Sequence, residues 1–113
     1  MVNRYETVFI LTPVLSEAQM KEAVQKFKEL ISSKGGKMHH VEDWGLKKLA
    51  YPIQHKSTGF YTLFDFECEG SLIEELEVEI KRDERILRFL TVKMDKYHVI
   101  YADKKRKQKA ETE

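Results

Sequence analysis

Two places in this sequence carry side chains that could do acid–base, nucleophilic or metal chemistry. His39 and His40 are adjacent, and imidazole rings serve both as general acids or bases and as zinc ligands. Cys68 is the single cysteine, and a thiolate can act as a nucleophile. Adjacent residues of a strand point to opposite faces of the sheet, so we do not expect the two histidine rings to bind one ion. The carboxylates of Glu67 and Glu69 are expected to raise the pKa of the thiol between them, which disfavours its reactive form.

The sequence has no motif that supports an enzyme. No glycine-rich phosphate loop, nucleophile elbow or pair of catalytic acids occurs in it. A single cysteine also excludes an internal disulfide and the cysteine-rich zinc sites. We therefore predict no catalytic residue, no metal site and no cofactor. One alternative stays open, a small dimeric enzyme that closes two sheets over a pocket and uses His39 or His40 as its acid or base.

Two clusters combine cations with an aromatic ring, which are the residue types that bind the phosphates, sugars and bases of RNA. The segment GLKKLAYPI holds Lys47, Lys48 and Tyr51. Arg4 and Tyr5 repeat the combination near the start of the chain, where a guanidinium could bind a phosphate through two parallel hydrogen bonds. On composition alone such clusters are more often a solvated surface, so a choice needs further information.

The length, composition and net charge of the chain limit the kinds of protein that it could be. The chain has 113 residues, 42% hydrophobic and 35% charged, which fits one folded domain. No apolar run approaches the roughly 20 residues needed to cross a bilayer, and no export signal opens the chain, so we expect a cytoplasmic protein. The net charge is +1, of which residues 102–113 carry +2, with five cations against three acidic residues, and the rest −1. Binding to nucleic acid must therefore rest on local clusters.

The spacing of apolar residues predicts four strands and two helices in one domain. The strands are expected over residues 5–12, 37–53, 60–68 and 86–94, and the helices over residues 17–34 and 70–83. Capping boxes at Ser16 with Gln19 and at Ser71 with Glu74 are expected to open the helices. The remaining predictions are a turn over residues 54–59, an irregular segment over 96–101, a domain over 1–101 and a basic, mobile tail over 102–113.

This order is β-α-β-β-α-β, the split arrangement of the ferredoxin-like α+β fold. Right-handed crossovers place both helices on one face of a four-stranded antiparallel sheet and leave the other face uncovered. The more aromatic side of the strands is expected beneath the helices, and the uncovered face is expected to carry Val8, Ile10, Tyr61, Leu63, Leu90 and Val92. Such a patch fits either a partner or the ordinary apolar surface of a small protein.

Four segments of the sequence together resemble one known family. They are Arg4-Tyr5-Glu6, GLKKLAYPI at 45–53, Gly59-Phe60-Tyr61 and RDERILRFLTVK at 82–93. In these segments, and over about residues 3–95, the chain is similar to protein six of the bacterial small ribosomal subunit. The resemblance implies a non-enzymatic protein of the cytoplasmic ribosome that binds the central domain of the small-subunit rRNA together with ribosomal protein eighteen. It also implies no cofactor, no small-molecule substrate and no membrane contact.

The resemblance further implies a role for particular residues. RNA contacts would fall on Arg4, Tyr5, Lys47 and Lys48. The protein partner would lie at the edge of the second strand, near Leu49 and Tyr51. Many relatives have arginines at the basic pair, and lysines act there as point charges without the planar fork. For the tail two alternatives stay open, added nonspecific affinity for phosphates or a solubilising end without fixed contacts.

Overall fold

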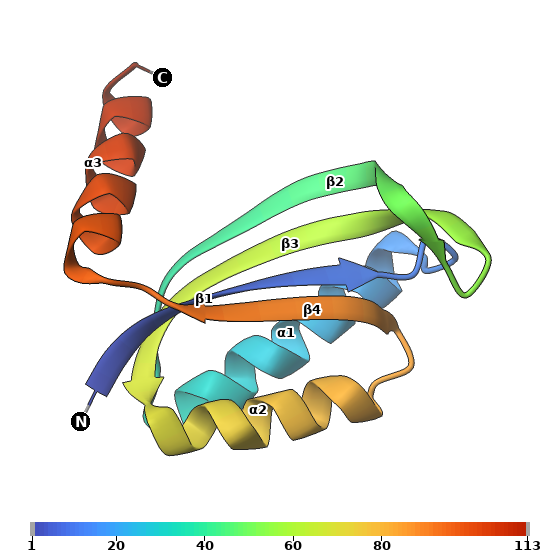
Figure 1. The fold of residues 1–113 in the computed structure, drawn as a ribbon, viewed down its shortest axis with the longest axis horizontal. Helices are drawn as coiled ribbons and strands as arrows, with labels where there is room; N and C mark the ends of the chain where they lie inside the picture. The colour runs from blue at the N-terminus through green and yellow to red at the C-terminus, as the bar shows by residue number, and fades with distance from the viewer. Residues whose placement is uncertain (1, 113) are drawn as a thin grey trace.

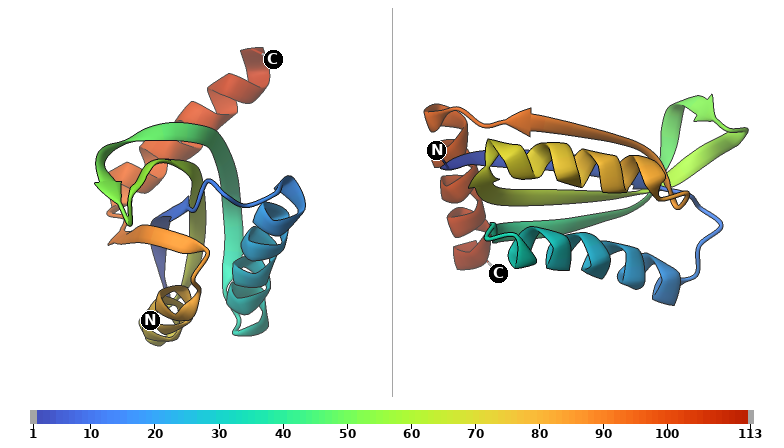
Figure 2. Two further views of the ribbon diagram at one scale, coloured as in Figure 1. Left: turned by 90° about the vertical axis from the view of Figure 1, so that its right-hand side faces the viewer. Right: turned by 90° about the horizontal axis from the view of Figure 1, so that it is seen from below.

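The computed structural model describes the backbone of residues 2–112 and the side chains of residues 2–104 (Figure 1). The elements, in chain order, are β1 (Val2–Leu11), α1 (Glu17–Ser33), β2 (Lys37–Ile53), β3 (Lys56–Glu69), α2 (Gly70–Arg82), β4 (Ile86–Lys93) and α3 (Lys96–Thr112). The strands form one antiparallel sheet in the order β2-β3-β1-β4. Helices α1 and α2 lie side by side against one face of this sheet (Figures 1 and 2). The predicted ferredoxin-like fold is confirmed.

The two helices against the sheet begin differently. Ser16 caps α1 as predicted, because its hydroxyl accepts a hydrogen bond from the backbone amide of Gln19 at 3.2 Å and the Gln19 side chain accepts one from the Ser16 amide at 2.8 Å. The predicted capping box at Ser71 is wrong. Strand β3 runs through Glu69, which becomes the N-cap of α2 without a side-chain capping hydrogen bond. No loop separates the strand from the helix, so Ser71 falls inside the first turn.

The core lies between the helices and the more aromatic side of the sheet. Phe9 is at its centre, with its ring 4.8 Å from that of Phe64 and 5.6 Å from that of Phe27 on α1. As predicted, the more aromatic side of the sheet is buried here, and its buried residues include Tyr5, Phe9, Leu11, Phe64 and Phe66. The other side of the sheet, called the open face below, carries the alternate residues of each strand. As predicted, these include Val8, Ile10, Tyr61, Leu63, Leu90 and Val92, but only Leu90 and Val92 are exposed and Leu63 is buried.

Strands β2 and β3 form a long hairpin whose end curls beyond the helices (Figures 1 and 2). The predicted turn over residues 54–59 is wrong, because only Gln54 and His55 turn, with φ of 49° and 65°, and β3 begins directly after them. A two-residue turn with both φ angles positive matches the twist of paired strands. The curl begins at Gly45, where φ is 75° and the register of β2 shifts. Residues 45–59 are called the arm below.

A third helix follows β4, where an irregular segment was predicted over residues 96–101. The carboxylate of Asp95 accepts a hydrogen bond from the backbone amide of His98 at 2.7 Å and so caps the start of α3. Helix α3 lies on the opposite side of the sheet from α1 and α2, at the end where β1 begins (Figures 1 and 2). It runs across the predicted boundary between residues 101 and 102. The mobility of the tail, residues 102–113, stays a prediction.

Candidate nucleic-acid interface

The four predicted RNA contacts lie at two opposite ends of the sheet. Arg4 and Tyr5 are at the beginning of β1, beside the start of α3. Lys47 and Lys48 are on the arm, past the far ends of the helices (Figure 1). The structure therefore does not bring the two clusters together, and each must be judged in its own surroundings.

Arg4 is held by two carboxylates. Its Nε and Nη2 atoms donate to the two carboxylate oxygens of Asp65 at 2.7 and 2.8 Å, and its Nη1 and Nη2 atoms donate to Asp103 of α3 at 3.1 and 2.8 Å. The hydrogen bonds that Arg4 donates to Asp65, and then those to Asp103, raise the pKa of Arg4 above its usual range. Because the Arg4 side chain is only 12% exposed, an RNA phosphate must displace Asp103 to reach it.

Tyr5 points to the other side of β1, into the core. Its ring lies 6.1 Å from that of Phe66, and the residue is 8% exposed. Strand alternation separates it from Arg4, which faces the open side. The ring is therefore packed beneath the sheet and offers no exposed face on which a base could stack.

The arm presents its cations to solvent. Lys47 and Lys48 are both exposed, and among side chains of residues 2–104 neither pairs with a carboxylate. The Lys47 ammonium lies 5.2 Å from the ring centre of Trp44, which itself stacks on Tyr61 with 6.3 Å between ring centres. This end of the molecule thus combines positive charge with aromatic rings.

The two residues of the predicted partner edge differ in exposure. Tyr51 is exposed on the arm, whereas Leu49 is buried. A Cβ on Gly59 would lie 3.6 Å from a methyl of Leu49 and only 2.5 Å from Ile10, so glycine allows the arm to approach β1 closely there. Leu49 therefore packs the arm from within, and Tyr51 is the residue that a partner could touch.

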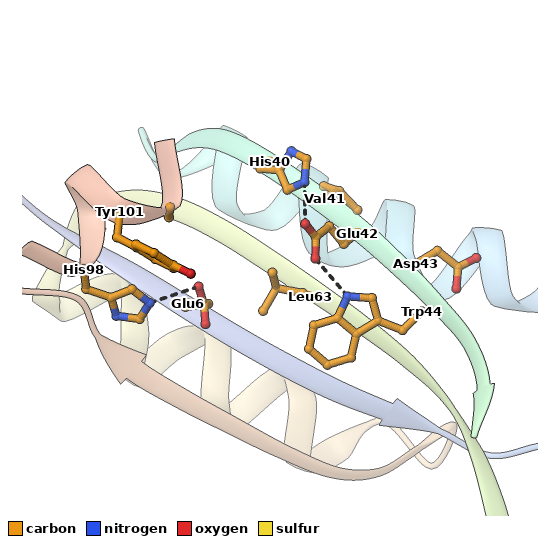
Figure 3. A pocket seen from close by; sticks show the side chains of 10 residues that line it. Glu6, His40, Val41, Glu42, Asp43, Trp44, Leu63, His98 and Tyr101 are labelled. Carbon is orange, nitrogen blue, oxygen red and sulfur yellow. Dashed lines mark hydrogen bonds and ion pairs between the residues drawn. The ribbon is translucent and has the colours of Figure 1, made fainter. Parts of the chain in front are cut away.

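The histidines and the cysteine are placed in structural roles. His39 contacts the carboxylate of Glu67, and the Nε2 atom of His40 lies 3.0 Å from Glu42 (Figure 3). Within the described part of the chain, no group of three or more histidine, cysteine or acidic side chains could hold a metal ion. Burial of Cys68, with a smaller contribution from the charge of Glu69, raises the pKa of the thiol to about 11.

Sequence reasoning missed the carboxylates that surround Arg4 and the part played by Trp44. A signal existed for Asp65, since it follows the apolar side chains of Tyr61 and Leu63 on the same face of β3. The sequence carries no comparable signal that Asp65 pairs with Arg4. Arg4 stands directly opposite Glu67 and reaches Asp65 along a diagonal, which only the strand register reveals.

These observations first define a class of protein, a small binding protein with a ferredoxin-like body and an exposed cationic arm. The family described as "Ribosomal protein S6" matches residues 4–93. The chain belongs to this family, so it is a structural protein of the small ribosomal subunit and not an enzyme. The alternative of a histidine-dependent enzyme is therefore wrong.

Relatives and a solved structure match over nearly the whole chain. The small ribosomal subunit protein bS6 of Phocaeicola vulgatus is 61% identical over 109 residues, which cover 96% of each chain. That of Christiangramia forsetii is 54% identical and covers 97% of this chain and 98% of its own. The crystal structure of 30S ribosomal protein S6 from Thermotoga maritima has a TM-score of 0.80 at 29% identity, covering 98% of this chain and 99% of that one. Separately, no helix within residues 2–112 has the length and apolar character to cross a membrane.

Proposed function

We propose that this protein binds the central domain of the small-subunit rRNA together with ribosomal protein eighteen, in the cytoplasm. The observation that best supports RNA binding is the arm, which carries Lys47 and Lys48 exposed and beyond the helices. Phosphate contacts need positive charge that can reach the backbone of the nucleic acid. The arm supplies both, and it does so without a competing carboxylate among the described side chains.

The residues at the two ends then have different parts in RNA binding. Lys47 and Lys48 contact phosphates as point charges. Arg4 joins them where a phosphate replaces Asp103, because its guanidinium keeps the second carboxylate, Asp65, as a partner. Tyr5 does not contact RNA; its ring packs in the core against Phe66 and so stabilises the strand that carries Arg4.

The contribution of protein eighteen is expected along β2. Tyr51 is exposed there and can pack against a partner, with Leu49 supporting the arm beneath it. A body with nearly balanced charge attracts RNA weakly by itself, so a second protein that shares the RNA surface strengthens the complex. Binding of the two proteins to rRNA is then coupled.

Coupling is tested by titrating a central-domain rRNA fragment with this protein in the presence and absence of protein eighteen, at one salt concentration. Linkage requires that each protein tighten the binding of the other by the same factor. Equal affinity with and without the partner would contradict joint binding. No detectable binding to the fragment in either case would contradict the RNA contact itself.

A shortened chain that ends at Asp103 tests the tail and keeps the second carboxylate partner of Arg4. If the basic run of residues 104–109 contacts phosphates, removing it makes the dependence of RNA affinity on salt less steep. An unchanged salt slope would instead assign the tail a solubilising role.

A further inference from the structure

The open face changes in character along its length. Cross-strand pairing arranges its residues in rows that run across β4, β1, β3 and β2. The row nearest α3 holds Arg4, Glu67 and Lys37, whose formal charges sum to +1. The next row is Val92, Glu6, Asp65 and His40, followed by Leu90, Val8, Leu63 and Glu42, and the row nearest the arm is Arg88, Ile10, Tyr61 and Gly45. Carboxylates therefore gather toward α3, while Arg88 and Lys47 lie toward the arm.

The end of the open face next to α3 is acidic, and it is called the acidic end below. It holds the carboxylates of Glu6, Glu42, Asp65 and Asp103 against the guanidinium of Arg4, a formal charge of −3 with neutral histidines. RNA is a polyanion, so the net charge of this end disfavours it except at Arg4, which a phosphate reaches only by displacing Asp103. A cationic protein segment is attracted for the same reason. The two ends of the sheet thus favour partners of opposite charge.

A hollow of about 610 Å³ opens at the acidic end between β2 and α3 (Figure 3). The rings of Trp44 and Tyr101 and the side chain of Leu63 line it, and Glu6 and Glu42 lie between them. The indole nitrogen of Trp44 donates to Glu42 at 2.8 Å, which fixes the position of that carboxylate. Aromatic faces beside carboxylates bind a lysine or arginine side chain through cation–π contact and charge-assisted hydrogen bonds.

Apolar side chains continue from the hollow onto β4. Leu90 is 64% exposed and Val92 is also exposed, each in a row that holds a carboxylate. Strand β4 is at the edge of the sheet, so a partner can reach these side chains from the side of the sheet as well as from its face. Apolar surface next to carboxylates matches a protein segment with both apolar and basic side chains, which RNA does not offer.

We propose that the acidic end is the docking surface for a basic segment of a protein partner, with a lysine or arginine side chain entering the hollow between Trp44 and Tyr101. The inference rests on the proposed function, in which the partner is protein eighteen, and adds the surface and the chemistry that it uses. Strand β2 carries Glu42 and Trp44 at the hollow and Tyr51 on the arm. One partner lying along β2 therefore touches both.

The test neutralises the two carboxylates of the hollow without changing side-chain shape. The double variant E6Q/E42Q keeps the acceptor for the Trp44 indole and removes two negative charges. Its matched control is E29Q/E74Q, which makes the same charge change on the two helices of the opposite face. In titrations with purified protein eighteen and no RNA, we expect E6Q/E42Q to bind roughly tenfold more weakly with a shallower salt dependence, and the control to bind like the wild type.

A second readout follows the hollow directly. Trp44 is the single tryptophan of the chain, so its fluorescence reports on the occupant of the hollow. A short oligoarginine peptide, added without RNA or protein eighteen, should change this emission in the wild type and in E29Q/E74Q. The change should be lost in E6Q/E42Q, because the peptide then has no carboxylates to bind.

Either readout can overturn the docking surface. It is wrong if E6Q/E42Q binds protein eighteen as tightly as the control, or if oligoarginine leaves the Trp44 emission of the wild type unchanged. Weaker binding of the rRNA fragment by E6Q/E42Q alone would assign this end to RNA and would also overturn the proposal. If the wild type binds no protein eighteen, the proposed function loses its partner, and the peptide titration by itself decides the docking surface.

Discussion

The two ends of the sheet contain the same residue types in different surroundings. At the start of β1, the guanidinium of Arg4 is bound by two carboxylates and the ring of Tyr5 is packed in the core. On the arm, Lys47 and Lys48 are exposed and contact no carboxylate among the described side chains. A cation beside an aromatic ring therefore has a structural role at one end and is available for binding at the other. The neighbouring strands, which are distant in sequence, determine which role applies.

The largest effect is expected when Arg4 loses its charge. Asp65 is fully buried, and replacing Arg4 by methionine leaves its carboxylate without the guanidinium that binds both oxygens. We expect R4M to lower the free energy of unfolding by roughly 3 kcal/mol, measured by urea denaturation. The double variant R4M/D65N should recover much of the loss, because the buried charge is removed as well.

Urea denaturation of a variant without the two lysines of the arm should give a contrasting result. The variant K47A/K48A should change the free energy of unfolding by less than about 0.5 kcal/mol, since both side chains are exposed. If K47A/K48A destabilises the protein as much as R4M, the lysines of the arm support the fold as Arg4 does, and the contrast between the two ends is wrong.

A second ion pair, Asp83 with Arg85 between α2 and β4, extends the comparison because its contribution to stability depends on pH. Asp83 follows α2 and accepts hydrogen bonds from the side chain of Arg85 at 2.7 and 2.9 Å and from its backbone amide at 3.0 Å. These contacts, with the side-chain bonds contributing most, lower the pKa of Asp83 from 3.8 to about 2. The carboxylate of Asp83 is thus held in place by Arg85, whereas Lys47 and Lys48 have no carboxylate partner among the described side chains.

The direction of the pH effect follows from that shift. A carboxyl with a lower pKa in the folded state stabilises the fold above its unfolded pKa, and the stabilisation is lost as pH falls through the folded value. We expect D83N to cost about 2 kcal/mol near neutral pH and to unfold with the same stability as the wild type near pH 2. Urea denaturation at a series of pH values measures the difference. A constant difference between the two chains across this range would contradict the assignment to the Asp83 carboxylate.

The third effect concerns RNA affinity. We expect K47A/K48A to weaken binding to the rRNA fragment roughly tenfold and to reduce the salt slope by up to about two, because each lysine contributes one phosphate contact. Filter binding or anisotropy at several salt concentrations measures both quantities. The control is K21A/K81A, which removes two exposed lysines from α1 and α2 and should leave affinity and slope nearly unchanged. Equal losses in the two variants would show that the arm has no special part.

Much of the fold follows from local patterns in the sequence. The capping box at Ser16 and the aromatic alternation of β1 and β3 predicted the start of α1 and the side of the sheet that the helices cover. Helix α3 escaped prediction because Tyr97, Ile100 and Tyr101 are exposed, so its apolar residues mark no buried face. Its remaining signal was the capping residue Asp95.

The site was less predictable because its meaning depends on pairing between strands. Lys47 and Lys48 were assigned through the family resemblance of GLKKLAYPI, and their surroundings are local, since the Lys47 ammonium contacts the ring of Trp44 three residues earlier. The surroundings of Arg4 are not local, because Asp65 and Asp103 lie 61 and 99 residues further along the chain. Local sequence thus identifies residues whose surroundings are local, whereas residues that act through distant neighbours need the register of the sheet.

The smallest effect tests whether the Arg4 end can be made to resemble the arm. The Asp103 side chain is 56% exposed, and an exposed ion pair contributes roughly 0.2–1 kcal/mol. We therefore expect D103N to change the free energy of unfolding by less than about 1 kcal/mol and to raise affinity for the rRNA fragment roughly two- to threefold at low salt, because part of the Arg4 guanidinium then becomes accessible to a phosphate. In the R4M background the same substitution should leave RNA affinity nearly unaltered. A gain that persists without Arg4 would mean that Asp103 acts through general repulsion of the RNA rather than by occupying this guanidinium.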